Sequence, residues 1–112
     1  MAATLSRRRP GHTYDFAVGT VQATLTVTEA PDGQPAEIFL RADKQGSTMA
    51  GLCESLAIAT TLTLQQHAPV GVLVHRLLGE RAADSGATGD PEVPAASSLP
   101  DYVARRLAVD YL

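Results

Sequence analysis

Hydrophobic and polar positions alternate along the first third of the chain, as they do in half-buried β-strands. Over 13–18 and again over 21–28, every second side chain is apolar or aromatic, and the second stretch places Gln and Thr on its other face. A third alternating stretch, 36–42, follows the sequence PDGQP at 31–35, whose proline, aspartate and glycine favour a tight turn. This pattern predicts an antiparallel meander of three strands.

The period changes after residue 46, where apolar side chains recur at intervals of three and four residues. This spacing predicts a long helix over 47–67, with Ser47 or Thr48 as its cap and Pro69 just beyond its end. Pro69 then opens a second, shorter helix over 70–78. The side chains expected on the buried stripe of the long helix are Met49, Leu52, Cys53, Leu56, Ala59 and Thr63.

The short helix is expected to end at Gly79, because glycine most readily takes the left-handed conformation of a C-cap. Residues 80–97 are rich in Ala, Gly, Ser, Asp and Pro and show no periodicity. We therefore expect a long surface loop there. A loop of this length either pins the last helix or contacts a partner, and both readings are open.

The final helix is predicted from 98 to the C-terminus. Ser98 and Asp101 stand three residues apart, the spacing of a capping box, so each side chain is expected to accept a hydrogen bond from the backbone. An apolar stripe follows them. The charged side chains of this helix are expected in solvent and comprise Arg105, Arg106 and Asp110.

These elements predict an α+β fold in which a three-stranded antiparallel meander is followed by two to three packed helices. The 112 residues suit one domain, which we place at 13–112 behind a flexible basic arm at 1–12. The arm contains Arg7, Arg8 and Arg9 without interleaved aromatic residues. Because three such arginines supply little affinity and the net charge is only −3, nucleic-acid binding is not expected.

Composition also limits the cellular compartments in which the protein is expected. No stretch approaches the 18 or more apolar residues of a membrane span, and no apolar run of a secretory signal follows the arginines. A single cysteine excludes an internal disulfide and agrees with a reducing environment. We therefore expect a cytoplasmic protein without a membrane partner.

The best candidate for ligand binding is an anion site at the start of the long helix. Gly46, Ser47 and Thr48 stand where a strand passes into a helix, with Lys44 close by, and unpaired amides at a helix N-terminus attract phosphate or carboxylate groups. The spacing is not that of a P-loop. An ordinary helix cap with a solvated lysine is the competing interpretation.

No catalytic or metal-binding residues are predicted. The three histidines, His12, His67 and His75, lie far apart and have no acidic partner at metal-ligand spacing. Cys53 falls on the apolar stripe of the long helix, where a thiol is usually a small buried hydrophobe. No arrangement of a nucleophile with a base can be read from the sequence.

The acidic residues of the 80–97 stretch are the closest local set of carboxylates. They are Asp84, Asp90 and Glu92, and their spacing matches no calcium-binding loop. We therefore assign them to solubility.

Several segments in order resemble the C-terminal domain of class II, adenosylcobalamin-dependent ribonucleotide reductases. They are AEIFL at 36–40, KQGST at 44–48, the apolar helix over 51–64 and DPEVP at 90–94. The sequence SSLPD at 97–101 is similar to the T-S-C-P-D motif that names this domain. Leu99 occupies the position of the motif's cysteine, so a thiol role at that position is lost.

The resemblance implies a link to deoxyribonucleotide synthesis without catalysis by this chain alone. The related full-length enzymes use adenosylcobalamin and oxidise a pair of thiols, whereas Cys53 has no second cysteine. The resemblance therefore implies a free-standing accessory, regulatory or assembly module that holds no cofactor. Its expected partner is another protein or a second copy of itself, since an open sheet edge suits a homodimer.

Two other functions stay open at this stage. One is a small phosphate- or nucleotide-binding protein that uses the 44–48 turn. The other is an enzyme in its own right.

Overall fold

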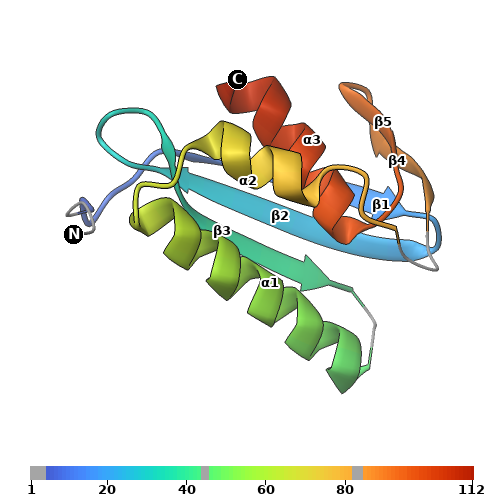
Figure 1. The fold of residues 1–112 in the computed structure, drawn as a ribbon. Helices are drawn as coiled ribbons and strands as arrows, with labels where there is room; N and C mark the ends of the chain where they lie inside the picture. Colours follow the sequence, from blue (N-terminus) through green and yellow to red (C-terminus); the bar gives the residue numbers. More distant parts are fainter. Residues whose placement is uncertain (1–4, 44–45, 82–84) are drawn as a thin grey trace.

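Three antiparallel strands form the main sheet of the computed structural model, which describes residues 5–43, 46–81 and 85–112. The strands β1 (Gly11–Val18), β2 (Val21–Glu29) and β3 (Pro35–Ala42) lie side by side in chain order (Figure 1). The predicted meander is confirmed. The first strand begins two residues earlier than predicted, because Gly11 and His12 pair with Thr28 and Val27 of β2.

The turn between β2 and β3 has the predicted chemistry. Gly33 takes a φ of 82°, which a residue with a Cβ rarely adopts, and its amide donates to the carbonyl of Ala30 over 2.9 Å. Asp32 accepts a hydrogen bond from the amide of Gln34 over 3.0 Å. These local bonds fix the register in which Leu25 of β2 faces Leu40 of β3.

Three helices complete the α+β fold that the sequence predicts. They are α1 (Ser47–Gln65), α2 (Val70–Leu77) and α3 (Leu99–Tyr111). Figure 1 shows α2 and α3 over one face of the sheet, whereas α1 runs back along the outer side of β3. Among the described residues, no helix combines the length and the hydropathy needed to cross a bilayer.

The core lies between the sheet and α3. Every second residue of β2 from Val21 to Val27 is buried against the helices, as the alternation predicts. The rings of Phe16 on β1 and Tyr102 on α3 stack with centroids 3.7 Å apart and planes 6° from parallel. Leu107 of α3 is fully buried. This helix is therefore the central packing element of the domain.

Helix α1 buries fewer side chains than predicted. Its buried residues are Cys53, Ala57, Thr60 and Leu64, whereas Leu52 and Ala59 of the predicted stripe are exposed. The reason is its position beside the edge of the sheet rather than across a face. Thr61 contacts that edge, where its hydroxyl lies 2.8 Å from the amide and 3.2 Å from the carbonyl of Ile38.

The ends of α1 also differ from the prediction. Gly46 is the N-cap residue, and no side chain caps the helix, so the expected cap at Ser47 or Thr48 is wrong. The helix ends at Gln65, and His67 beyond it takes a φ of 63°. Gly79 follows α2 with a φ of 80°, which confirms the left-handed position predicted there.

Residues 80–97 contain a second, two-stranded sheet, so the prediction of a continuous loop is wrong. Strands β4 (Gly86–Asp90) and β5 (Val93–Ala96) pair as an antiparallel hairpin. The strands are short, and Gly86 and Gly89 take φ values of 139° and 77°. Backbone of this kind leaves no period-two pattern in the sequence, which explains why the hairpin escaped detection.

Candidate functional site

The predicted anion site lies at an exposed helix start. Gly46, Ser47 and Thr48 are all exposed at the N-terminus of α1, and Lys44 lies outside the described residues. The amides of this first turn point along the helix axis, as an anion site requires. The site stays a prediction, because the described geometry is also that of an ordinary helix start.

The anion-site hypothesis predicts a local response to nucleotides. Titration of the ¹⁵N-labelled protein should shift the amide signals of Gly46, Ser47 and Thr48, and Lys44→Ala should weaken the response without changing the melting curve. Unchanged signals at about 1 mM nucleotide would reject the site, since weaker binding lies below about 4 kcal/mol.

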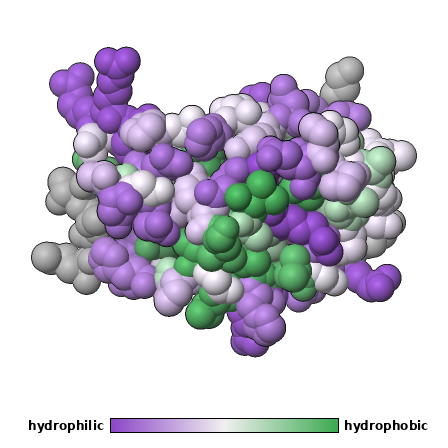
Figure 2. All heavy atoms as spheres, turned by 90° about the horizontal axis from the view of Figure 1, so that it is seen from above, coloured by the Kyte–Doolittle hydropathy of each residue, from purple (hydrophilic) through white to green (hydrophobic). Residues whose placement is uncertain are grey.

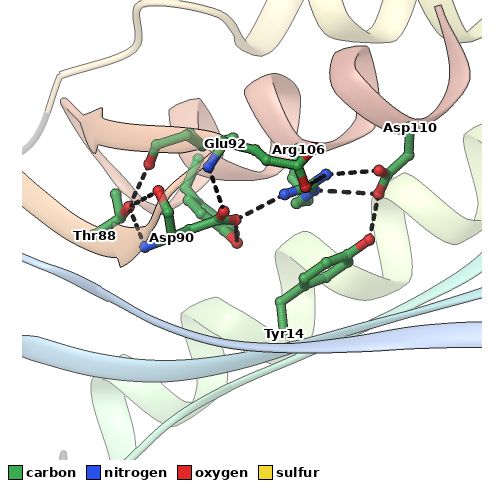
Figure 3. A network of polar contacts seen from close by, with 8 residues as sticks. Tyr14, Thr88, Asp90, Glu92, Arg106 and Asp110 are labelled. Atoms are coloured by element: carbon green, nitrogen blue, oxygen red, sulfur yellow. Dashed lines mark hydrogen bonds and ion pairs between the residues drawn. The ribbon is translucent and has the colours of Figure 1, made fainter.

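A buried ion cluster around Arg106 is the most strongly charged place in the described structure. Only 1% of Arg106 is exposed, so the expectation that it lies in solvent is wrong. Its Nη1 donates to Asp90 Oδ2 over 2.9 Å, and its Nη2 donates to Glu92 Oε1 over 3.1 Å and to Asp110 Oδ1 over 2.6 Å. Figure 3 shows the guanidinium between the hairpin and the end of α3. The assignment of Asp84, Asp90 and Glu92 to solubility is therefore wrong for Asp90 and Glu92, whereas Asp84 lies outside the described residues.

Three further side chains complete the cluster, one each from β1, α3 and β4. The Tyr14 hydroxyl of β1 donates to Asp110 Oδ2 over 2.5 Å, and its ring lies under the Arg106 guanidinium at 4.4 Å (Figure 3). The Tyr102 hydroxyl donates to Asp90 Oδ2 over 2.7 Å. Within the hairpin, Thr88 donates to the carbonyl of Val93 and accepts from the amide of Asp90.

Hydrogen bonding decides the charge states in this cluster. Burial alone would raise the pKa of Asp90, but hydrogen bonds from Tyr102 and Arg106 outweigh it and hold that pKa below its usual value. In the same way, bonds from Arg106 and Tyr14 lower the pKa of Asp110. Burial and the bond to Asp110 raise the pKa of Tyr14 to about 12. The two aspartates are therefore ionised, and the tyrosine is neutral, at neutral pH.

The cluster is built to hold the fold together rather than to bind a ligand. It joins β1, the hairpin and α3, and within the described residues no buried side-chain nitrogen or oxygen lacks a hydrogen-bond partner. A phosphate would have to displace one of three carboxylates from Arg106. One part of the cluster could have been predicted from the sequence. Arg106 and Asp110 have the i,i+4 spacing of a helical ion pair.

The lowered pKa values predict that the protein loses stability in acid. An aspartate whose pKa is lower in the folded state stabilises the fold above its unfolded pKa of about 3.9, and this contribution disappears as the pH falls through the folded value. The free energy of unfolding in urea should therefore be flat between about pH 7 and 5 and decrease steeply below about pH 4. A value that stays constant down to pH 3 would contradict the ionised cluster.

The sequence Ser97–Asp101 forms the junction between β5, α2 and α3. Ser98 is the N-cap of α3, and its Oγ accepts from the amide of Asp101 over 3.1 Å, so this half of the capping box is confirmed. The carboxylate of Asp101 is fully buried and accepts from the amides of Ser97 over 2.9 Å and Gly79 over 2.6 Å. Arg105 donates to it over 2.8 Å. Asp101 therefore ties the end of α2 to the start of α3.

Leu99, in the middle of the same motif, lines an apolar hollow of about 310 Å³. Cys53 lies in the wall of this hollow and is 3% exposed, and burial raises the pKa of its thiol. The thiol is therefore protonated at neutral pH and behaves as the small buried hydrophobe that the sequence predicts. The hollow offers contact with apolar groups, and its lining comprises Val18, Val21, Met49, Leu52, Cys53, Leu56, Leu99 and Pro100.

A comparison with models of protein families shows to which family the chain belongs. The model of the TSCPD domain matches residues 3–111. The chain belongs to the TSCPD domain family. The resemblance found in the sequence is thereby confirmed, and the buried Ser98 and Asp101 show that the motif residues of this TSCPD domain have structural roles. No solved structure matches the chain significantly.

Curated relatives of this TSCPD domain are vitamin B12-dependent ribonucleotide reductases. The enzymes of Streptantibioticus cattleyicolor and Streptomyces avermitilis are each 40% identical over 108 residues, which are 96% of this chain. The enzyme of Rhodopirellula baltica is 31% identical over 104 residues. The chain spans only 18%, 11% and 10% of the lengths of these three relatives.

The hollow of this TSCPD domain does not fit a cobalamin. The corrin ring carries amide side chains around its rim, and burial of these amides against a nearly wholly apolar wall would leave them without hydrogen-bond partners. A hollow of about 310 Å³ also stands at the lower end of the range for drug-sized ligands. The described residues contain no group of three or more His, Cys, Asp and Glu that could hold a metal ion.

Proposed function

We propose that this TSCPD domain acts by binding another protein, as a non-catalytic accessory, regulatory or assembly module of a B12-dependent ribonucleotide reductase. One observation carries the proposal: in three relatives named for this activity, the matching unit makes up only 10% to 18% of a much longer chain. The domain would thus serve deoxyribonucleotide synthesis through its contacts with another protein. We expect it in the cytoplasm, whose reducing conditions keep Cys53 a thiol.

The thiol content supports a role without chemistry of its own. Reduction of a ribonucleotide needs two electrons, which a pair of thiols supplies by forming a disulfide. The chain has one cysteine, and its thiol is buried and protonated. Because a single thiol cannot close a disulfide within these residues, the electrons would have to come from outside this domain.

An apolar surface on the side of α2 and α3 supports a protein partner. Figure 2, seen from above, shows hydrophobic side chains gathered between polar ones. On these two helices, Val72 is 57% exposed and Val109 is 46% exposed. A groove of about 440 Å³ adjoins Val109 and contains Glu92 and Arg105 at its rim. Exposed apolar surface with a charged rim is typical of protein interfaces.

Binding to a reductase tests the proposal. The partner is a B12-dependent reductase from which its own TSCPD domain has been removed, and the intact reductase is the control. We expect the truncated enzyme to co-elute with this domain and to change its turnover, and we expect the intact enzyme to bind it more weakly. Val72→Glu, at an exposed position, should weaken the complex at least about tenfold. No complex at about 50 µM of each protein would contradict the proposal.

A further inference from the structure

The outer face of α1 lacks the charges that a solvated helix carries. The helix has 19 residues, of which four are buried and one, Glu54, is charged. Its large apolar side chains are nevertheless exposed, with Leu52 at 62%, Ile58 at 53% and Leu62 at 55%. A helix that is apolar around most of its circumference is normally covered on both sides. One side of α1 packs on β3, and its other side is an apolar surface that no other described element covers.

This exposed apolar surface extends across a groove onto the sheet. A groove of about 520 Å³ runs between β3 and α1, with Ile58 and Leu62 on its helix side. Phe39 lines its strand side and is 53% exposed. Glu37 and Arg41, two residues before and after Phe39, lie on the same side of β3, and Glu37 is ion-paired with Arg9 over 2.7 Å. The exposed Glu54 of α1 also lines the groove.

We infer that the outer face of α1 and this groove bind a second copy of the chain. The two copies of α1 would cross antiparallel around a two-fold axis near the middle of the helix. In such an interface, each contact occurs twice, so one surface must be complementary to itself. The spacing of small and large side chains on this surface meets that condition.

The shape is self-complementary because small and large residues repeat at equal spacing. Gly51 and Ser55 are four residues apart, as are Ile58 and Leu62, and all four are exposed or half-exposed on the outer face. When two such helices run antiparallel, Leu62 of one copy faces Gly51 of the other, and Ile58 faces Ser55. Large side chains then fill the spaces over small ones, which allows the helices to approach closely.

Phe39 lies close to the middle of the α1 face. Thr61 is bonded to Ile38, and one strand residue, at about 3.3 Å, advances as far as about two helix residues. A two-fold axis there would bring Phe39 close to Phe39 of the second copy. Glu37 is already ion-paired within its own chain, with Arg9 over 2.7 Å, so it is not counted among the contacts of the dimer.

The oligomeric state in solution tests this inference. In light scattering coupled to gel filtration, the protein should have twice its chain mass of 11.7 kDa at about 100 µM and dissociate on dilution. Ser55→Arg, at an exposed position, should weaken the dimer at least about tenfold by blocking the close approach.

Val72→Glu is the matched control, because it adds a charge to an exposed apolar position of α2 and should leave the dimer intact. Circular dichroism checks that every variant is folded. A wild type that is monomeric at all concentrations overturns the inference, as does a dimer that Ser55→Arg leaves unchanged. If Ser55→Arg instead abolishes reductase binding by a monomeric protein, α1 serves the reductase and the inference is wrong, while the proposed function stands.

Discussion

Replacement of Arg106 by alanine is expected to lower the free energy of unfolding by about 3–5 kcal/mol, which is the cost of removing one partner from a buried ion pair. Asp90 and Asp110 would lose the hydrogen bonds that keep their carboxylates ionised in a buried environment. A small domain has only about 5–15 kcal/mol of stability in total. The variant should therefore melt far below the wild type or fail to fold. Urea unfolding at neutral pH measures the difference.

Two further substitutions sharpen this experiment. Arg76→Ala removes an arginine from an exposed position of α2 and should change the stability by no more than about 0.5 kcal/mol. Arg106→Lys keeps the charge, but an ammonium cannot reproduce the planar fork that reaches three carboxylates, so most of the loss should remain. An Arg106→Ala protein within about 1 kcal/mol of the wild type would show that the cluster contributes little.

The second large effect is expected at Asp101, in the motif that names the family. Asp101→Ala removes the acceptor for the amides of Ser97 and Gly79 in a place that water does not reach. Buried donors without a partner cost about 1–3 kcal/mol each, so we expect a total loss of about 3 kcal/mol. Thermal and urea unfolding should both report it.

Ser98→Ala is the comparison for Asp101→Ala, because it removes the N-cap of the same helix and leaves the two amide bonds to Asp101 in place. Loss of an N-cap costs about 1 kcal/mol. Asp101→Ala should therefore be clearly more destabilising than Ser98→Ala. Equal effects would mean that Asp101 acts only as part of the helix cap and does not connect α2 to α3.

The sequence was sufficient to predict the parts of the fold that depend on a regular hydrophobic period or on a local turn or capping signal. The meander could be predicted because β2 alternates strictly and Gly33 terminates it in a turn that few other residues allow. The start of α3 could be predicted because a capping box is a local signal, readable without tertiary context. Such elements have the same preferences in isolation as in the folded chain.

Features that arise only from tertiary contacts could not be predicted from the sequence. Arg106 was expected in solvent because charged residues usually are, and its burial depends on carboxylates 14 and 16 positions away in the hairpin. The hairpin itself has no alternating pattern of apolar and polar residues. It is stabilised by the hydrogen bond between Thr88 and Asp90 and by the ion cluster. No local propensity encodes either feature.

For the candidate site, the sequence identified the family and the motif but misjudged where the surface would be apolar. Leu52 and Ala59 were assigned to the core because helical spacing shows that a face exists without showing what covers it. The position of α1 at the sheet edge exposes that face. The anion site at Gly46–Thr48 could be proposed from a local helix start alone, and it still depends on the nucleotide titration.

The proposed function assigns this TSCPD domain contact with another protein and no catalysis of its own. The most direct measurement supplies the purified chain with adenosylcobalamin, a dithiol and a ribonucleotide, and follows the formation of deoxyribonucleotide. We predict no product from the chain alone. Steady deoxyribonucleotide formation by the chain in the absence of any other protein would contradict the claim.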